Sequence, residues 1–301
     1  MEYIRESNME ISCINDLEDI KKACINNEIL CARALIYEKG SGLHFNIGNY
    51  KAIMPREEVA YSPHLSYIKE AAIITRINKK VAFKITDIYQ QNGLTTIIVS
   101  RKKLQQQVYD EYISQLQPGD VIPCTVTHVD SFGVFCDIGY GVTALLPIDF
   151  ISVSRINSPA DRFFAGQNIY CCIKNIGTDG KIVLSHKELL GNWLENAQMF
   201  TPQTTVTGVV RSVESYGVFV ELSPNLAGLA EPCEGVEIGD YVKVFIKSIL
   251  PDKMKIKLVI VDISDSLHEM NNIPYFITSG HIDHWDYSTK YSKKQISTVF
   301  E

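Results

Sequence analysis

Residues 129–138 read VDSFGVFCDI, and residues 213–222 read VESYGVFVEL. Both stretches carry a serine, an aromatic residue, Gly-Val-Phe and an apolar–acidic–apolar ending in the same order. A strand-like run precedes each of them, at residues 121–129 and 206–213. Repetition of this kind indicates two copies of one folding unit.

Each copy continues in the same way on its C-terminal side. A Gly-containing segment rich in β-branched and aromatic residues follows at residues 165–173 and again at 238–246, and a last strand follows at 181–185 and 255–259. Valine, isoleucine and threonine are too dense here for helices. Five short alternating strands in about 70 residues predict a small closed barrel.

A third and weaker copy lies earlier in the chain. Residues 42–48 align with residues 133–139, and residues 51–55 align with the stretch that ends at Pro147. Strands at 71–75, 81–88 and 95–100 are expected to complete this copy.

Helical periodicity is confined to the segments around these units. Apolar residues recur every three or four positions from Ile11 to Cys24, which predicts a helix within residues 1–28, with Asn15 or Asp16 as a cap. Residues 104–116 and 188–197 are expected to be helical linkers that join the units like beads. The pattern does not place residues 264–301.

Composition limits the class of protein. The chain has 301 residues, of which 46% are hydrophobic and 21% are charged, and its apolar runs fall far short of the ~20 residues needed to span a bilayer. Its start is acidic and polar, so no secretory signal is expected. The eight cysteines form no C-x-x-C pair, which favours reduced thiols in a reducing, cytoplasmic compartment.

The formal net charge of −6 hides an uneven distribution. Residues 1–28 carry seven acidic and three basic side chains, whereas residues 29–103 carry twelve basic and five acidic ones. Local patches decide the attraction to phosphate. The basic block is therefore interpreted as a clamp on RNA backbone, as a docking face for an acidic protein or ribosomal RNA, or as a solvated surface.

The aromatic pairs of the repeats are the candidate chemistry. Phe132 and Phe135 are three residues apart and would point to opposite faces of a regular strand. A break at Gly133 lets both rings reach the outer face while Val134 and Cys136 point into the barrel. Two exposed rings form a stacking platform for nucleobases. The alternative is that the rings belong to the core.

The repeated motifs, together with the terminal K-I-x-L strand, resemble the S-one-type RNA-binding domain of bacterial ribosomal proteins. The resemblance covers residues 29–262. It implies an all-β fold of three tandem five-stranded Greek-key barrels of the oligonucleotide-binding kind. The implied units are 29–103, which is degenerate and basic, 116–188 and 203–263.

The family binds single-stranded RNA through two aromatic residues, a histidine, an aspartate and an arginine. By position, the resemblance assigns aromatic contacts to four rings and basic contacts to two lysines: Phe132, Phe135, Tyr216, Phe219, Lys181 and Lys255. Pro147 and Glu231 replace the histidine, and Asp179 and Asp252 lie near the acidic position. The first copy has Ser41 and His44 in place of the rings.

A lysine stripe adds to the third copy. Lys253, Lys255 and Lys257 alternate with Met254, Ile256 and Leu258, which predicts three ammonium groups on one strand face. The stripe is interpreted as a phosphate track, or as protection of an exposed strand against edge pairing.

No motif for catalysis or for a cofactor is found in the chain. There is no phosphate-binding loop and no nucleophile elbow, and His281-x-x-His284 lacks a third metal ligand, so no enzyme activity, metal or cofactor is expected. The expected partners are single-stranded mRNA and the small ribosomal subunit, with no membrane and a monomer off the ribosome. The alternatives are an RNA-binding regulator and a protein-interaction scaffold away from the ribosome.

Overall fold

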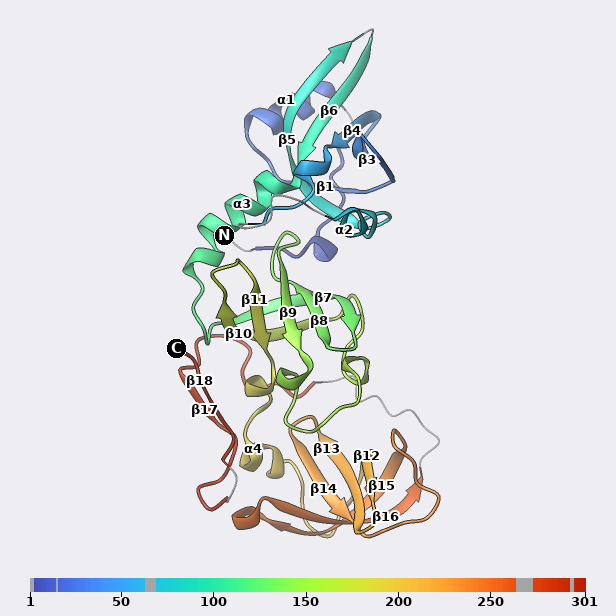
Figure 1. The fold of residues 1–301 in the computed structure, drawn as a ribbon, viewed down its shortest axis with the longest axis vertical. Coiled ribbons are helices and arrows are strands. Elements are labelled where there is room, and N and C mark those ends of the chain that lie inside the picture. The colour runs from blue at the N-terminus through green and yellow to red at the C-terminus, as the bar shows by residue number, and fades with distance from the viewer. Residues whose placement is uncertain (1–2, 15, 63–68, 92, 264–272, 293–294) are drawn as a thin grey trace.

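The computed structural model describes residues 3–14, 16–62, 69–91, 93–263, 273–292 and 295–301. Three β-units follow one another along the long axis of the molecule, coloured from blue through green to orange in Figure 1. Among the described residues, no helix is both long enough and apolar enough to cross a membrane. All eight cysteines are free thiols, as predicted.

The middle unit is a closed five-stranded barrel, as predicted. Its strands are arranged in the order β10-β11-β9-β8-β7, with antiparallel neighbours except for the parallel pair β9 and β11. Val134 and Cys136 point into its core. The strands are β7 (Val121–Asp130), β8 (Gly133–Asp137), β9 (Thr143–Pro147), β10 (Asn168–Ile176) and β11 (Ile182–Ser185).

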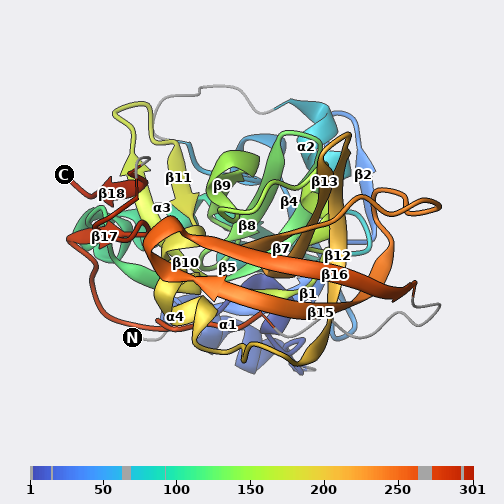
Figure 2. The same cartoon turned by 90° about the horizontal axis from the view of Figure 1, so that it is seen from below.

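The third unit repeats this topology. Its closed barrel has the order β12-β13-β14-β16-β15, and β14 and β16 form the parallel pair. Figure 2 shows it from below, with the long strands β15 and β16 in front. The strands are β12 (Thr205–Glu214), β13 (Gly217–Ser223), β14 (Leu226–Ala230), β15 (Tyr241–Leu250) and β16 (Lys255–Ile263).

The first unit is a curled sheet of six strands rather than a closed barrel of five. Its order is β1-β5-β6-β4-β3-β2, so that β1 and β2, the two halves of one interrupted strand, lie at opposite edges. Ala34 and Leu35 separate these halves. The strands are β1 (Leu30–Arg33), β2 (Ile36–Glu38), β3 (Gly42–Ile47), β4 (Tyr50–Met54), β5 (Lys80–Gln91) and β6 (Leu94–Ser100).

One strand predicted in the first unit is wrong. Residues 71–75 lie mostly in the helix α2 (Glu70–Ile74), because Glu-Ala-Ala favours a helix and only Ile73 needs a buried position. Because β1 and β2 count as the two halves of one strand, the unit has the same five strand positions as the other barrels. The helix α2 lies where a further strand was expected.

Helices flank the three units. The helix near the N-terminus is shorter than predicted: α1 (Leu17–Ile25) starts at Asp16, whose carboxylate accepts the Glu18 N–H at 2.6 Å. The expected linker helices are α3 (Arg101–Glu111) and α4 (Trp193–Ala197). Short 3-10 turns are η1 (Glu6–Asn8), η2 (Arg56–Glu58), η3 (Ile113–Gln115), η4 (Ile148–Phe150), η5 (Pro159–Asp161), η6 (Lys187–Leu190) and η7 (Pro251–Lys253).

The C-terminal segment runs along the middle and third barrels, and its hairpin lies beside the middle barrel in Figure 1. The Ile282 N–H donates to the Gly119 carbonyl at 3.0 Å, next to the middle barrel. The Tyr287 hydroxyl donates to the Asn225 carbonyl of the third barrel at 2.6 Å. The hairpin consists of β17 (His284–Asp286) and β18 (Ser297–Val299).

Buried ion pairs join the units, so they are not beads on linkers. Glu6 precedes the first unit and lies between it and the middle barrel, where its carboxylate accepts from Arg101 Nε at 2.7 Å and its N–H donates to Asp137 at 2.7 Å. Arg162 of the middle barrel donates to Glu221 of the third barrel at 2.5 and 2.6 Å. Breaking such a buried pair strongly destabilises an interface.

Candidate nucleic-acid interface

The two aromatic rings of the middle barrel lie together outside its core. Phe132 is 49% exposed and Phe135 is half-buried. Their centroids are 5.9 Å apart and their planes meet at 87°. Neither ring is part of the apolar cluster inside the barrel, which contains Val134 and Cys136 instead. We call Phe132 and Phe135 the middle platform.

The third barrel carries the same arrangement. Tyr216 is 64% exposed, Phe219 is half-buried, and their centroids lie 6.2 Å apart with planes at 90°. Val218 and Val220 on either side of Phe219 are buried in the barrel. We call Tyr216 and Phe219 the third platform.

The glycine between the rings is required by the close approach of the next strand. A side chain at Gly133 would lie 2.5 Å from the Leu146 carbonyl oxygen, and one at Gly217 would lie 2.4 Å from that of Ala230. The glycines therefore let β9 and β14 pair with the start of the ring-bearing strands. The break predicted at Gly133 is the start of β8, and Phe132 lies in the turn before that strand.

Strand register continues the third platform into a row of outward side chains, which we call the third row. Phe219 on β13 pairs with Leu229 on β14, and Leu229 pairs with Lys257 on β16. Ser212 on β12 lies on the other side of Phe219. Lys257 thus lies in the same row as a platform ring.

The corresponding row of the middle barrel has different ends, and we call it the middle row. Phe135 pairs with Leu145, and Leu145 pairs with Val183, which occupies the place of Lys257. At the other end, His128 on β7 pairs with Phe135. The platforms are alike, but the middle row ends in an imidazole and an apolar side chain, and the third row ends in a hydroxyl and an ammonium group.

Lys255 and Lys257 share the outer face of β16, as predicted, but Lys253 does not. Lys253 belongs to η7, and Met254 has φ +49°, so the strand begins only at Lys255. The stripe on this strand face therefore contains two lysines rather than three.

Lys181 lies just before β11, two residues before Val183. Its ammonium group is 2.6 Å from the Asp179 carboxylate, and this hydrogen bond holds the pKa of Asp179 below its ordinary value. Both side chains are exposed, so the pair is accessible to solvent and to a ligand.

The positions that lack the family histidine have structural partners. Pro147 pairs with Gly133 at the end of β9. Glu231 follows β14, and Lys247 donates to it at 2.9 Å, which lowers the pKa of Glu231. Neither position adds a ring to its platform.

Three of the twelve basic side chains of the first unit contact the N-terminal segment of the molecule. Arg101 is 1% exposed and bonds Glu6, and Arg76 also lies 3.8 Å from that carboxylate. Lys80 donates to the carbonyls of Ser7 and Met9 at 3.2 and 2.7 Å. These three residues hold the N-terminal segment in place, which narrows the basic surface expected for RNA or a docking partner.

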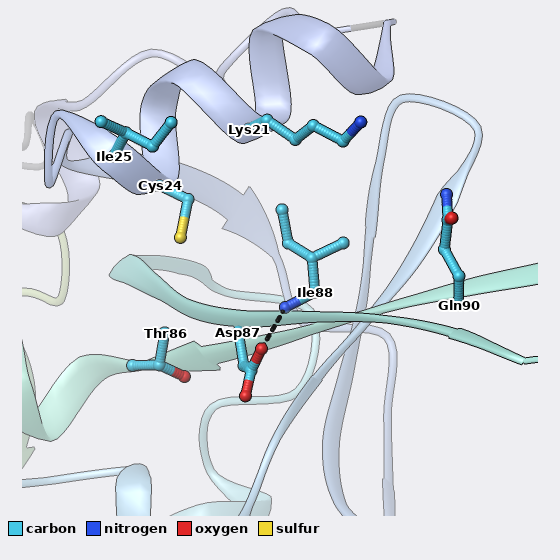
Figure 3. A pocket seen from close by; sticks show the side chains of 7 residues that line it. All are labelled: Lys21, Cys24, Ile25, Thr86, Asp87, Ile88 and Gln90. Carbon is cyan, nitrogen blue, oxygen red and sulfur yellow. Dashed lines mark hydrogen bonds between the residues drawn. The ribbon is translucent and has the colours of Figure 1, made fainter.

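A pocket in the first unit lies outside the predicted site. Figure 3 shows it between α1 and the hairpin of β5 and β6, where Asp87 accepts the Ile88 N–H at 2.8 Å. None of the predicted contact residues lines it. It is lined by Lys21, Cys24, Ile25, Thr86, Asp87, Ile88 and Gln90.

Sequence reasoning missed His128. Regular alternation along β7 does not place this side chain opposite Phe135, because a bulge between Val126 and His128 shifts the register. The alignment of the two copies places His128 at the same position as Ser212, and this difference between the copies is the sequence signal that could have drawn attention to His128.

Comparison with known proteins matches these features. The model of the family described as "S1 RNA binding domain" matches residues 115–187, which contain the middle barrel. The small ribosomal subunit protein bS1 of Staphylococcus aureus (strain COL) is 28% identical over 252 residues, 78% of this chain and 62% of the relative. The bS1 of Leuconostoc lactis is 31% identical over 198 residues, 60% of this chain and 46% of the relative.

This chain thus spans about half to two thirds of the length of these relatives. Among solved structures, a multidomain protein with nucleic acid binding domains from Streptococcus pneumoniae is 12% identical, with a TM-score of 0.27, over 81% of this chain and 77% of that one.

Proposed function

This chain is a homologue of the bacterial small ribosomal subunit protein bS1, with an S1 RNA binding domain at residues 115–187, and on that premise we propose that it binds single-stranded RNA across its middle and third barrels. The observation that carries the proposal is the pair of equivalent ring platforms outside the two barrel cores. Paired exposed rings at the same position of two barrels indicate a binding surface more strongly than a single exposed ring does, and nucleobases stack on such rings without regard to sequence.

The chemistry of each barrel has two parts. Bases stack on Phe132 and Phe135 in the middle barrel, and on Tyr216 and Phe219 in the third. The basic groups Lys181, Lys255 and Lys257 neutralise phosphates nearby, so that affinity falls with salt. Lysine lacks the planar fork of arginine, which favours backbone attraction over base reading.

The names of the relatives support a biological role at the small ribosomal subunit, which is the second part of the proposal. The protein assists the binding of mRNA at the small ribosomal subunit, in the cytoplasm, without catalysing a reaction and as a monomer away from the ribosome. An RNA-dependent association with small subunits separates this role from that of a regulator acting elsewhere. Sedimentation of cell extract tests the ribosomal role. We expect the protein to sediment with small subunits and to be released from them by nuclease.

The first prediction concerns the middle platform. Phe132→Ala with Phe135→Ala weakens binding of a labelled pyrimidine-rich RNA by about tenfold or more, because each stacked base contributes roughly 1–3 kcal/mol. Fluorescence anisotropy of the full chain measures the dissociation constant. Tyr89→Ala is the control, since Tyr89 is a 55% exposed ring on β5 of the first unit, which carries neither platform. Equal affinity of the platform variant and the control contradicts the proposal.

A further inference from the structure

His128 owes its position to a β-bulge in the first strand of the middle barrel. Val126 pairs with Cys136 and His128 pairs with Phe135, so Thr127 is the extra residue on β7. The Thr127 hydroxyl donates to the Phe135 carbonyl at 3.0 Å and fixes the bulge there. Bulges re-aim side chains, and this one puts the imidazole beside the platform.

The imidazole lies in register with the platform rings. Its centroid is 6.3 Å from that of Phe135, and the two planes differ by 21°, whereas Phe132 meets Phe135 edge-on. His128 is exposed. Within the described part of the chain neither of its ring nitrogens has a hydrogen-bond partner, so both remain open to a ligand.

The third barrel has the same bulge without the ring. Val210 pairs with Val220 and Ser212 pairs with Phe219, so Arg211 is the extra residue there. Arg211 donates to Glu221 at 2.9 Å, and the same carboxylate accepts from Arg162 of the middle barrel. Arg211 is therefore part of the contact between the two barrels. Ser212 has the place of His128 but offers only a hydroxyl.

We infer that His128 is a third base-contacting side chain of the middle barrel, and that it makes this barrel the stronger of the two single-stranded RNA sites. The inference rests on the proposed function. A base seated on the platform meets a second flat ring in His128, and the free ring nitrogens can bond a base edge or a phosphate. Serine in the third barrel offers no stacking surface.

A reciprocal exchange in the full chain tests this inference. In a Tyr216→Ala/Phe219→Ala background, only the middle platform remains, and adding His128→Ser weakens RNA binding about fivefold, less than the loss of a whole platform. In a Phe132→Ala/Phe135→Ala background, only the third platform remains, and adding Ser212→His tightens binding about threefold. Anisotropy with one labelled pyrimidine-rich RNA measures all variants.

The controls distinguish a failure of the proposed function from a failure of the role inferred for His128. His284→Ser removes an exposed imidazole from the C-terminal hairpin and leaves affinity unchanged. Matching thermal unfolding curves show that each variant is folded. If the double-alanine backgrounds bind RNA like the unmodified chain, the proposed function fails. If they lose affinity but His128→Ser adds no loss, the proposed function stands and the role of His128 is overturned.

Discussion

The imidazole of His186 is 1% exposed and has a partner at each nitrogen. Nδ1 lies 2.8 Å from the Ile151 carbonyl, so Nδ1 carries the proton, and Nε2 accepts from the Tyr275 hydroxyl at 3.0 Å. That hydroxyl in turn accepts the Tyr170 N–H at 3.2 Å. A neutral histidine therefore ties the C-terminal segment to the middle barrel.

This arrangement predicts a loss of stability in acid. Burial, with a smaller contribution from the charge of Arg162, lowers the pKa of His186 to about 4. Above about pH 6.5 the imidazole is neutral in both the folded and the unfolded chain and has no effect. Between pH 6.5 and 4 only the unfolded chain takes up the proton, so the free energy of unfolding falls by on the order of 3 kcal/mol as the pH drops.

Urea unfolding of the full chain at pH 7 and pH 4 measures this loss. His186→Gln keeps polar atoms at the site but removes the titration, so its midpoint shifts less between the two pH values than that of the unmodified chain. The difference between the two shifts cancels the contribution of all other titrating groups. Parallel shifts would mean that His186 does not control the acid response.

Residue patterns predicted that the four rings lie outside the barrel cores, because the position of each ring depends on local geometry. The spacing of Phe132 and Phe135 around a glycine was enough to place both rings outside the barrel. The partners of Glu6 and Glu221 were out of reach, because each carboxylate pairs with an arginine that is distant in sequence and brought near only by folding. The place of His128 was not predicted because one extra residue in the bulge of β7 changes the face to which its side chain points, and the sequence does not mark the bulge.

Among the elements, β16 carries the two lysines that we propose as phosphate contacts of the third barrel. Its regular part starts at Lys255, and the left-handed residue Met254 separates it from Lys253. Sequence alternation alone predicted one continuous stripe, because a turn of three residues leaves the spacing of the lysines intact. The same local ambiguity explains why residues 71–75 were expected to be a strand and form most of α2.

This difference predicts unequal roles for the lysines. Lys257→Gln weakens RNA binding and reduces the steepness of the salt dependence by about 0.7, the value for one phosphate contact on a single strand. Lys253→Gln removes the same charge but leaves the slope nearly unchanged, since η7 is not part of the third row. Anisotropy titrations at four salt concentrations give the slopes. Equal slopes for both variants would restore the three-lysine track.

In the whole molecule, the middle and third barrels form one connected body. Glu221 is fully buried and accepts hydrogen bonds from Arg162 of the middle barrel and Arg211 of its own barrel. On the same barrel, the Asn225 side chain accepts the Val153 N–H at 2.9 Å and donates to the Gly191 carbonyl at 2.9 Å. These contacts fix the two platforms relative to one another. On the proposed function, an RNA strand that reaches both platforms therefore loses little further entropy when it makes the second contact.

Loosening this junction therefore affects long RNA more than short RNA. Arg162→Met leaves Glu221 with Arg211 alone, and we expect binding of an RNA long enough to reach both platforms to weaken about tenfold, while an oligonucleotide that fills one platform binds as before. Arg155→Met is the matched control, because it removes an exposed arginine from the same connection between β9 and β10. Anisotropy with the two RNA lengths measures the effect, and thermal unfolding checks that the junction has weakened. If the junction weakens while both RNAs keep their affinity, the two platforms act as independent sites and their fixed geometry has no part in binding.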